Sequence, residues 1–151
     1  MVDKSAQGAV GEPFEIVVER GKIAELARAV RAEHPDHRRE AAVPPPTFLT
    51  TTFFWEERVA GANPWHRVQM SQERGMHAEQ EYVFHGPPPA AGTRLICQSR
   101  IAEVYEKQGK RGGTLTFAVM VTEFRDETGR LVAEARMTGV ETERPPEGGG
   151  A

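Results

Sequence analysis

The sequence predicts a single α+β domain in which an antiparallel sheet wraps around a central helix. Its 151 residues are enough for one domain with a hydrophobic core. Residues 44–54 form the stretch PPPTFLTTTFF, which is too apolar on most sides for a surface helix. From Met76 onward the chain alternates with the period of strands, and turn residues separate the runs. Helices that precede such a meander pack on one face of its sheet.

The domain is predicted to occupy residues 13–143. Residues 1–12 contain few side chains that could pack, so we expect a flexible lead-in there. Residues 144–151 read RPPEGGGA and are expected to form a disordered tail. No internal repeat divides the segment between them, which favours one domain.

The composition is that of a soluble globular protein, and it excludes several classes of function. A net charge of −3 gives no overall attraction to nucleic acid or to an anionic membrane. No apolar run approaches membrane-spanning length, and the N-terminus has no signal-peptide core. The single cysteine, Cys97, excludes an intrachain disulfide, and its strand context predicts a buried, inert thiol. We expect a cytoplasmic protein without a metal or other cofactor, because the five histidines lack zinc-like spacing with carboxylates.

The first part of the domain is predicted to hold a short strand and an amphipathic helix. The strand covers residues 14–18, which favour extended backbone. The helix is indicated by apolar residues at positions i, i+3, i+4 and i+7, which are Ile23, Leu26, Ala27 and Val30. It must end by Glu33 or His34, because Pro35 disfavours α geometry in the residue before it.

The central helix is predicted to begin at Pro46, because proline is tolerated in the first turn of a helix. Its threonines make a poor autonomous helix, so burial in the protein must hold it. Residues 56–75 carry turn chemistry at 61–64 but no pattern that indicates regular structure. We therefore expect a long loop there, of the kind that is often functional or contacts a partner.

The second half of the chain is predicted to form antiparallel strands at residues 79–85, 93–105, 114–124 and 131–142. Imperfect alternation in the second of them predicts a bulge near Ala102 or Glu103. The third is apolar or small on both faces, so the far face of the sheet is expected to contact a second subunit. The sequence therefore predicts dimerisation through the sheet.

Three segments of the chain carry a resemblance to a known family. The first is HPDHRREAAVPPPTFLTTTFF at residues 34–54, together with the helix before it. The second is MHAEQEYVFHGPPPAAGTRL at 76–95, and the third is TLTFAVMVTEFRDETGRLVAEARMTGVET at 114–142. Together they resemble the hotdog-fold proteins of the MaoC-like dehydratase family. The second segment is the most specific, and it is similar to the N-terminal-type (FAS1-like dehydratase) domain of enzymes that contain two hotdogs.

Members of this family hydrate trans-2-enoyl thioesters, or dehydrate R-3-hydroxyacyl thioesters, on CoA or acyl carrier protein. The resemblance implies a catalytic Asp followed, after four intervening residues, by a His, because water must lose a proton while the α-carbon gains one. In this chain Pro35 matches the motif proline and His37 the motif histidine, but His34 stands where Asn is usual. Ala32 stands where the Asp should be, and alanine cannot deprotonate water. The chain thus resembles the family's non-catalytic domains, which lend acyl-binding surface to a partner hotdog with the Asp–His pair.

The catalytic candidates that follow from the resemblance are His37, His77 and His85, and each has a structural alternative. His37 lies among charged residues that predict a solvated connector. The other two flank the predicted strand at residues 79–85 and could be strand-end histidines that hydrogen-bond to backbone. A thioester channel and a structural role therefore both remain open for them.

The substrate-binding candidates come from the same resemblance and from the basic turn at residues 107–113. Those expected along the acyl thioester are Thr47, Phe48 and Gln80, although core packing would also explain Phe48. The turn carries Lys110 and Arg111 among glycines that let backbone amides approach an anion, which predicts contact with CoA phosphates. A solvated hairpin is the structural alternative for this turn.

We therefore expect a substrate-binding, catalytically incomplete hotdog subunit of an R-specific enoyl-CoA hydratase or 3-hydroxyacyl-thioester dehydratase. Its acyl tunnel would run along the central helix at the interface of a homodimer, or of a heterodimer with a motif-bearing MaoC-like hotdog subunit. Two other classes stay open: a hotdog acyl-CoA thioesterase with a carboxylate near the central helix, and a non-enzymatic acyl-thioester-binding module. Acyl chain length, the choice between CoA and acyl carrier protein, and activity of the chain alone also stay open.

Overall fold

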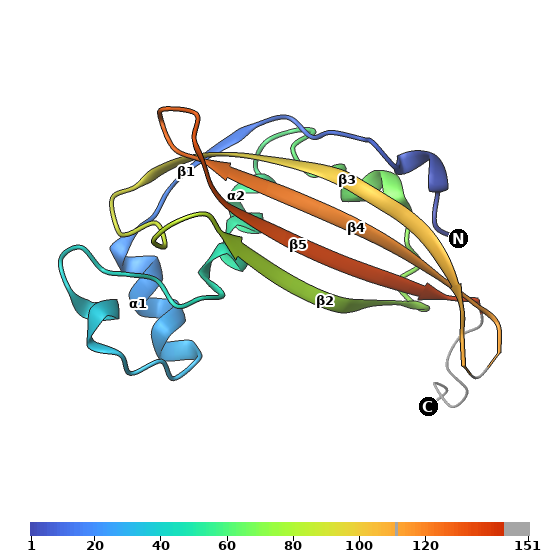
Figure 1. Ribbon diagram of the computed structural model, residues 1–151, viewed down its shortest axis with the longest axis horizontal. Helices are drawn as coiled ribbons and strands as arrows, with labels where there is room; N and C mark the ends of the chain where they lie inside the picture. Colours follow the sequence, from blue (N-terminus) through green and yellow to red (C-terminus); the bar gives the residue numbers. More distant parts are fainter. Residues whose placement is uncertain (111, 144–151) are drawn as a thin grey trace.

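The strands described in the computed structural model form one antiparallel sheet (Figure 1). The structure describes residues 1–110 and 112–143. The strand order is β1-β3-β4-β5-β2, so the two strands that precede β3 in the sequence lie at the edges. The strands are β1 (Phe14–Val17), β2 (Gly75–Phe84), β3 (Arg94–Gln108), β4 (Thr114–Arg125) and β5 (Leu131–Thr142). The helices are α1 (Arg20–Ala29) and α2 (Phe53–Glu56), with 3₁₀ turns η1 (Lys4–Ala6), η2 (Pro35–Arg38), η3 (Phe48–Thr52) and η4 (Pro64–Val68).

The strands predicted from the sequence agree closely with this sheet. β5 spans the predicted residues 131–142. The predicted bulge in β3 is confirmed, since its register against β4 shifts between Ile101 and Glu103. β2 begins at Gly75 rather than at residue 79, because a second bulge between His77 and Glu79 interrupts the alternation on which the prediction depended.

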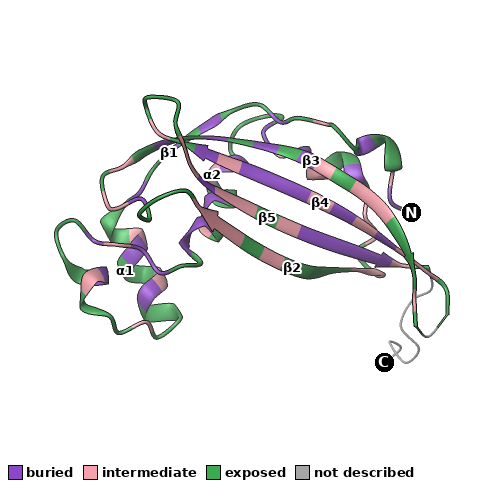
Figure 2. Cartoon of the chain, in the orientation of Figure 1, coloured by how far each residue is buried: buried purple, intermediate pink, exposed green. Residues whose placement is uncertain are grey.

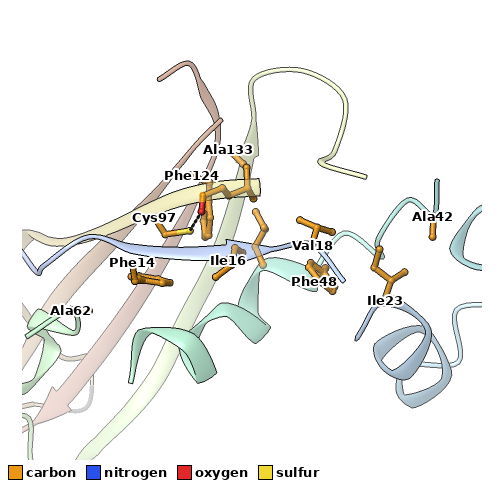
Figure 3. Packing of buried hydrophobic residues seen from close by; sticks show 12 residues of the cluster. Phe14, Ile16, Val18, Ile23, Ala42, Phe48, Ala62, Cys97, Phe124 and Ala133 are labelled. Carbon is orange, nitrogen blue, oxygen red and sulfur yellow. Dashed lines mark hydrogen bonds between the residues drawn. The ribbon is translucent and has the colours of Figure 1, made fainter. Parts of the chain in front are cut away.

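The core lies on one face of the sheet, which the helices and the N-terminal segment cover. Figure 2 shows buried residues concentrated along β4 and β5. The larger of two apolar clusters joins β1 and α1 to the sheet, and Figure 3 shows Phe14 and Ile16 beside Cys97 and Phe124. The smaller cluster lies farther along β3 and β4, around Ile101. Cys97 is buried as predicted, and burial raises the pKa of its thiol far above the usual range.

The central helix is shorter and less buried than the sequence predicts. It consists of the 3₁₀ turn η3 followed by the single α-helical turn α2. Its threonines explain the tight first turn, because the hydroxyls of Thr51 and Thr52 donate back to carbonyls three residues earlier. The face toward the sheet is buried, but Phe53 and Phe54 are 47% and 52% exposed. The expectation of burial on most sides is therefore wrong for these two aromatic residues.

The N-terminal segment packs against β3 instead of forming the flexible lead-in that the sequence predicts. The backbone amides of Gly8 and Gly11 donate to the carbonyls of Ile101 and Ser99, at 2.9 and 2.8 Å. Two side chains of the segment are buried, Val2 and Ala6. This attachment is not predictable from the sequence, because it uses backbone groups, which every residue carries. The predicted tail at 144–151 lies outside the described residues.

Helix α1 ends at Ala29, before the limit that Pro35 sets for it. Within residues 1–110 and 112–143, no helix has the length and apolar character needed to cross a membrane.

Candidate functional site

Three side chains of β2 lie on the core-facing side of the strand. His77, Gln80 and Tyr82 share this side because the bulge at Ala78 restores their alternation. The hydroxyl of Tyr82 is hydrogen-bonded to the hydroxyl of Thr50, so β2 and η3 meet at this point. Burial raises the pKa of the Tyr82 phenol. An elongated ligand that runs along this side of β2 would contact all three side chains.

A cavity of about 250 Å³ opens beside His77 at the start of β2. Its apolar wall is formed by one tryptophan and three methionines, which are Trp65, Met70, Met76 and Met137. Trp65 is held there by η4, where the Asn63 side chain accepts a hydrogen bond from the Trp65 amide at 2.9 Å. Flexible methionine side chains adapt to apolar ligands of varied shape. The sequence predicts a loop without regular structure in this region, so Trp65 and Met70 are not among the predicted site residues.

Gly139 sets the distance between the Trp65 ring and the sheet. A Cβ atom on this glycine would lie 2.8 Å from two carbon atoms of the ring and 3.0 Å from the Met70 sulfur. We expect Gly139→Ala to push the ring outward and to lower the free energy of unfolding by about 1–3 kcal/mol. Urea denaturation measures the loss, and fluorescence in a Trp55→Phe background reports on Trp65 alone, since the chain has 2 tryptophans. An unchanged emission spectrum would contradict this packing.

His77, near the start of β2, and His85, just after its end, lie too far apart to act on one substrate atom. About eight residues of strand separate them, which corresponds to about 26 Å. His77 is exposed, and its Nε2 atom lies 3.0 Å from the carbonyl oxygen of Glu79. His85 is exposed, and the hydrogen bond from its Nε2 to Glu134 at 2.9 Å lowers the pKa of that carboxyl. His77 borders the cavity, and His85 lies at the opposite end of β2.

His37 is buried, whereas the sequence predicts a solvated connector around it. Only 9% of its surface is exposed, and its Nδ1–H donates to the Val43 carbonyl at 2.6 Å. The Val43 amide in turn donates to the Asp36 carbonyl at 3.0 Å. The imidazole and this backbone bond together hold the two ends of the loop at residues 36–43. The carboxylate of Asp36 is ion-paired with Arg39 at 2.8 Å. The Nδ1 atom of His37 is thus bound to backbone, and no carboxylate is hydrogen-bonded to the ring among the described residues.

The remaining predicted contacts do not converge on one place. Phe48 is 2% exposed and packs in the larger apolar cluster, so core packing accounts for it. Thr47 is exposed just before η3, and Lys110 is exposed in the turn after β3. The turn η2, which carries His37, packs against α1 at one end of the sheet, whereas Lys110 follows β3 at the other end, and about 50 Å of strand separates the two ends (Figure 1). One thioester therefore cannot touch both residues within one chain. Arg111 lies outside the described residues.

A buried carboxylate that is not among the sequence-predicted candidates lies between the central helix and the sheet. Glu56, on α2, is 4% exposed and accepts a hydrogen bond from the Ser99 hydroxyl. The Ser99 hydroxyl also lies 2.8 Å from the hydroxyl of Thr122. Burial raises the pKa of the Glu56 carboxyl. This polar group lies between the two apolar clusters, and Glu56 is not among the residues that line the cavity beside His77.

The sequence matches one protein family over most of its length. The family is described as the FAS1-like, dehydratase domain region, and its profile covers residues 5–135. No curated protein matches the sequence.

Several solved structures resemble this chain. The C-terminally truncated HadBC (3R-hydroxyacyl-ACP dehydratase) complex from Mycobacterium tuberculosis has a TM-score of 0.70 and 26% sequence identity, over 89% of this chain and 96% of that one. A MaoC-like dehydratase has a TM-score of 0.74 and 22% identity over 91% of this chain, and the match covers 42% of the length of that dehydratase. The ChsH1-ChsH2 complex from Mycobacterium tuberculosis has a TM-score of 0.71 and 14% identity, over 96% of this chain and 89% of that one. These structures confirm the predicted α+β hotdog fold.

Proposed function

Because this chain belongs to the FAS1-like dehydratase family, we propose that it is a substrate-binding, catalytically incomplete subunit of an R-specific enoyl-CoA hydratase or 3-hydroxyacyl-thioester dehydratase. A second hotdog subunit would supply the catalytic Asp–His pair. Two of the similar structures, HadBC and ChsH1-ChsH2, are complexes, which supports a hotdog partner. The ligand would be an acyl thioester of CoA or of acyl carrier protein.

The observation that carries this proposal is the alanine at position 32. Hydration of an enoyl thioester needs a base that takes a proton from water and an acid that gives one to the α-carbon. Ala32 occupies the motif position of the Asp and has no titratable group. The nearby carboxylate of Asp36 is ion-paired with Arg39, and His37 is anchored to a backbone carbonyl through Nδ1. Half of the acid–base pair is thus missing, so a partner must provide it.

The acyl chain would lie between β2 and the central helix. The cavity beside Trp65 and Met137 offers apolar burial at one end of this path, and Gln80 and Tyr82 offer hydrogen-bonding groups along it. Apolar pockets with a few polar groups are typical of small-molecule sites. β2 is an edge strand, so the cavity would border any subunit that pairs with that edge. The proposed tunnel therefore lies at the subunit interface.

We expect the purified chain alone to leave crotonyl-CoA unhydrated. The enoyl-thioester absorbance measures hydration, and a free-thiol assay in parallel measures hydrolysis of the thioester. Addition of a MaoC-like subunit with an intact Asp–His motif should restore hydration. The same subunit with its motif Asp replaced by Asn should bind this chain without restoring activity, which makes it the control.

Other outcomes would favour other functions. Robust hydration by the chain alone would contradict catalytic incompleteness, and His37→Ala would then test whether the surviving motif histidine acts as the base. Release of free thiol by the chain alone would favour the thioesterase. Glu56 is the carboxylate on the central helix that such an enzyme would need, but its burial and its hydrogen bond to Ser99 give this alternative little support. Thioester binding without turnover in any combination would favour a binding module.

A further inference from the structure

The outer edge of β2 is open to another chain. β2 is last in the strand order, and among the described residues it pairs with β5 alone. Its ten residues therefore present a row of backbone amides and carbonyls that lack a strand partner on one side. The bulge at Ala78 disturbs the strand near its start, but the pairing is regular from Glu79 to Phe84. A regular strand edge of this length readily pairs with a strand of another protein.

Exposed aromatic side chains accompany this edge. Thr50, Phe53 and Phe54 share one face of the central helix, because they are spaced by three and four residues. The Thr50 hydroxyl is hydrogen-bonded to Tyr82 of β2, so this face begins beside β2, and the Phe54 ring lies 6.0 Å from Lys22 Nζ of α1. The rings of Phe53 and Phe54 lie 4.0 Å apart, and about half of each side chain is exposed. An exposed aromatic pair near an open strand edge is typical of a protein interface.

The outer face of the β2 edge is acidic. Glu79 and Glu81 are exposed on this face, one on each side of the inward-facing Gln80. Arg136 on β5 reaches Glu81 at 3.6 Å, whereas Glu79 has no ion pair among the described residues. Side chains directly opposite each other in a strand pair have Cβ atoms about 5 Å apart, so like charges there destabilise the pairing.

These carboxylates would oppose each other if β2 paired with a second copy of itself. In an antiparallel pair the position of the two-fold axis decides which residues face each other. An axis at Gln80 sets Glu79 opposite Glu81, and an axis at Glu79 or at Glu81 sets that residue opposite its own copy. Each of these registers, which use the middle of the strand, therefore places acid opposite acid.

From this geometry we propose that the β2 edge selects a different hotdog chain as its partner, one whose edge strand presents lysine or arginine opposite Glu79 and Glu81. Phe53 and Phe54 pack against the same partner. The partner's hotdog fold rests on the proposed function, but its basic edge rests on the charges of β2 alone. The acidic edge thus disfavours the homodimer, in which neither subunit would supply the missing Asp.

Charge reversal within this chain tests the proposal without the natural partner. Glu79→Lys/Glu81→Lys supplies a basic edge, and its 1:1 mixture with wild type is compared with each protein alone by sedimentation velocity. We expect a mixed complex whose dissociation constant is at least about tenfold lower than that of either protein alone and rises with salt. The control, Glu33→Lys/Glu103→Lys, makes the same charge change at exposed positions outside β2. Its mixture with wild type should associate no more than wild type alone.

A neutral variant provides a second measurement. Glu79→Gln/Glu81→Gln removes the repulsion between two copies, so its self-association should exceed that of wild type by about tenfold. A wild-type dimer as tight as the mixed complex, and unaffected by either double substitution, would overturn the proposal. Circular dichroism establishes that each variant is folded. No step measures enzyme activity, so the hydration assay and this test fail independently of each other.

Discussion

Gly11→Ala is expected to lower the free energy of unfolding by at least about 3 kcal/mol. A Cβ atom on Gly11 would overlap the carbonyl oxygen of Ala62, and it would lie 2.7 Å from the carbonyl carbon and 3.1 Å from Pro64 Cδ. These are backbone and ring atoms, which cannot rotate away as a flexible side chain does. The Gly11 amide is also hydrogen-bonded to the Ser99 carbonyl, so the segment cannot shift without leaving β3.

Gly21→Ala is the matched control, because the same substitution there has the opposite expected sign. Gly21 lies in α1, and no atom is within 4 Å of the position that its Cβ would take. Alanine is favoured over glycine in a helix by about 0.5–1 kcal/mol, so we expect stabilisation of that size. Urea denaturation of both variants and of wild type measures the two effects. Equal stability of Gly11→Ala and wild type would mean that the N-terminal segment does not pack here in solution.

Ser99→Ala is expected to destabilise the protein by about 1.5–3 kcal/mol, the range for a hydrogen bond to a charged group. The substitution leaves the buried Glu56 carboxylate without its donor, and the Thr122 hydroxyl loses its neighbour as well. Thr116→Val is the control, because Thr116 is buried on the same face of β4 without a side-chain hydrogen bond in the described structure. Its cost should stay below about 0.5 kcal/mol. Equal costs for the two variants would contradict the network.

The same network predicts how stability depends on pH. Burial raises the pKa of Glu56 in the folded state, so the folded chain holds this proton more tightly than the unfolded chain. The stabilising contribution is therefore complete below the ordinary glutamate pKa, and it is lost as pH rises through the raised pKa. Glu56→Gln has no such proton, so its stability relative to wild type should increase over that range. A relative stability that is constant with pH would argue against a buried titrating carboxyl.

The sequence predicts those elements of the fold whose signals are local. β5 follows a tight turn in which the Asp126 side chain accepts hydrogen bonds from the amides of Thr128 and Arg130, and its alternation is continuous. The burial of the central helix is harder to predict, because an apolar helix face looks the same in the sequence whether the core or a second subunit covers it. That ambiguity explains why burial was expected for Phe53 and Phe54.

The candidate site was less predictable because its residues meet only through tertiary structure. Gln80 and His77 were expected from the resemblance, and they lie on one face of β2. Trp65 belongs to a segment without helix or strand periodicity, so the sequence did not connect it with Met137. Glu56 looks like a solvent-facing helix residue in the sequence, and its partner Ser99 is 43 residues away.

The strand order affects how long β2 waits for its neighbour while the chain is being synthesised on the ribosome. β2 is complete before β3 and β4 are made, yet β5, its neighbour in the sheet, is the last of the described strands to appear. The intervening stretch of about 50 residues takes roughly 2–10 seconds to synthesise. Throughout that interval both edges of β2 are unpaired, and neighbouring nascent chains on one messenger carry the same strand. Glu79 and Glu81 then have a second use, because their charge opposes the association of identical strands before folding is complete.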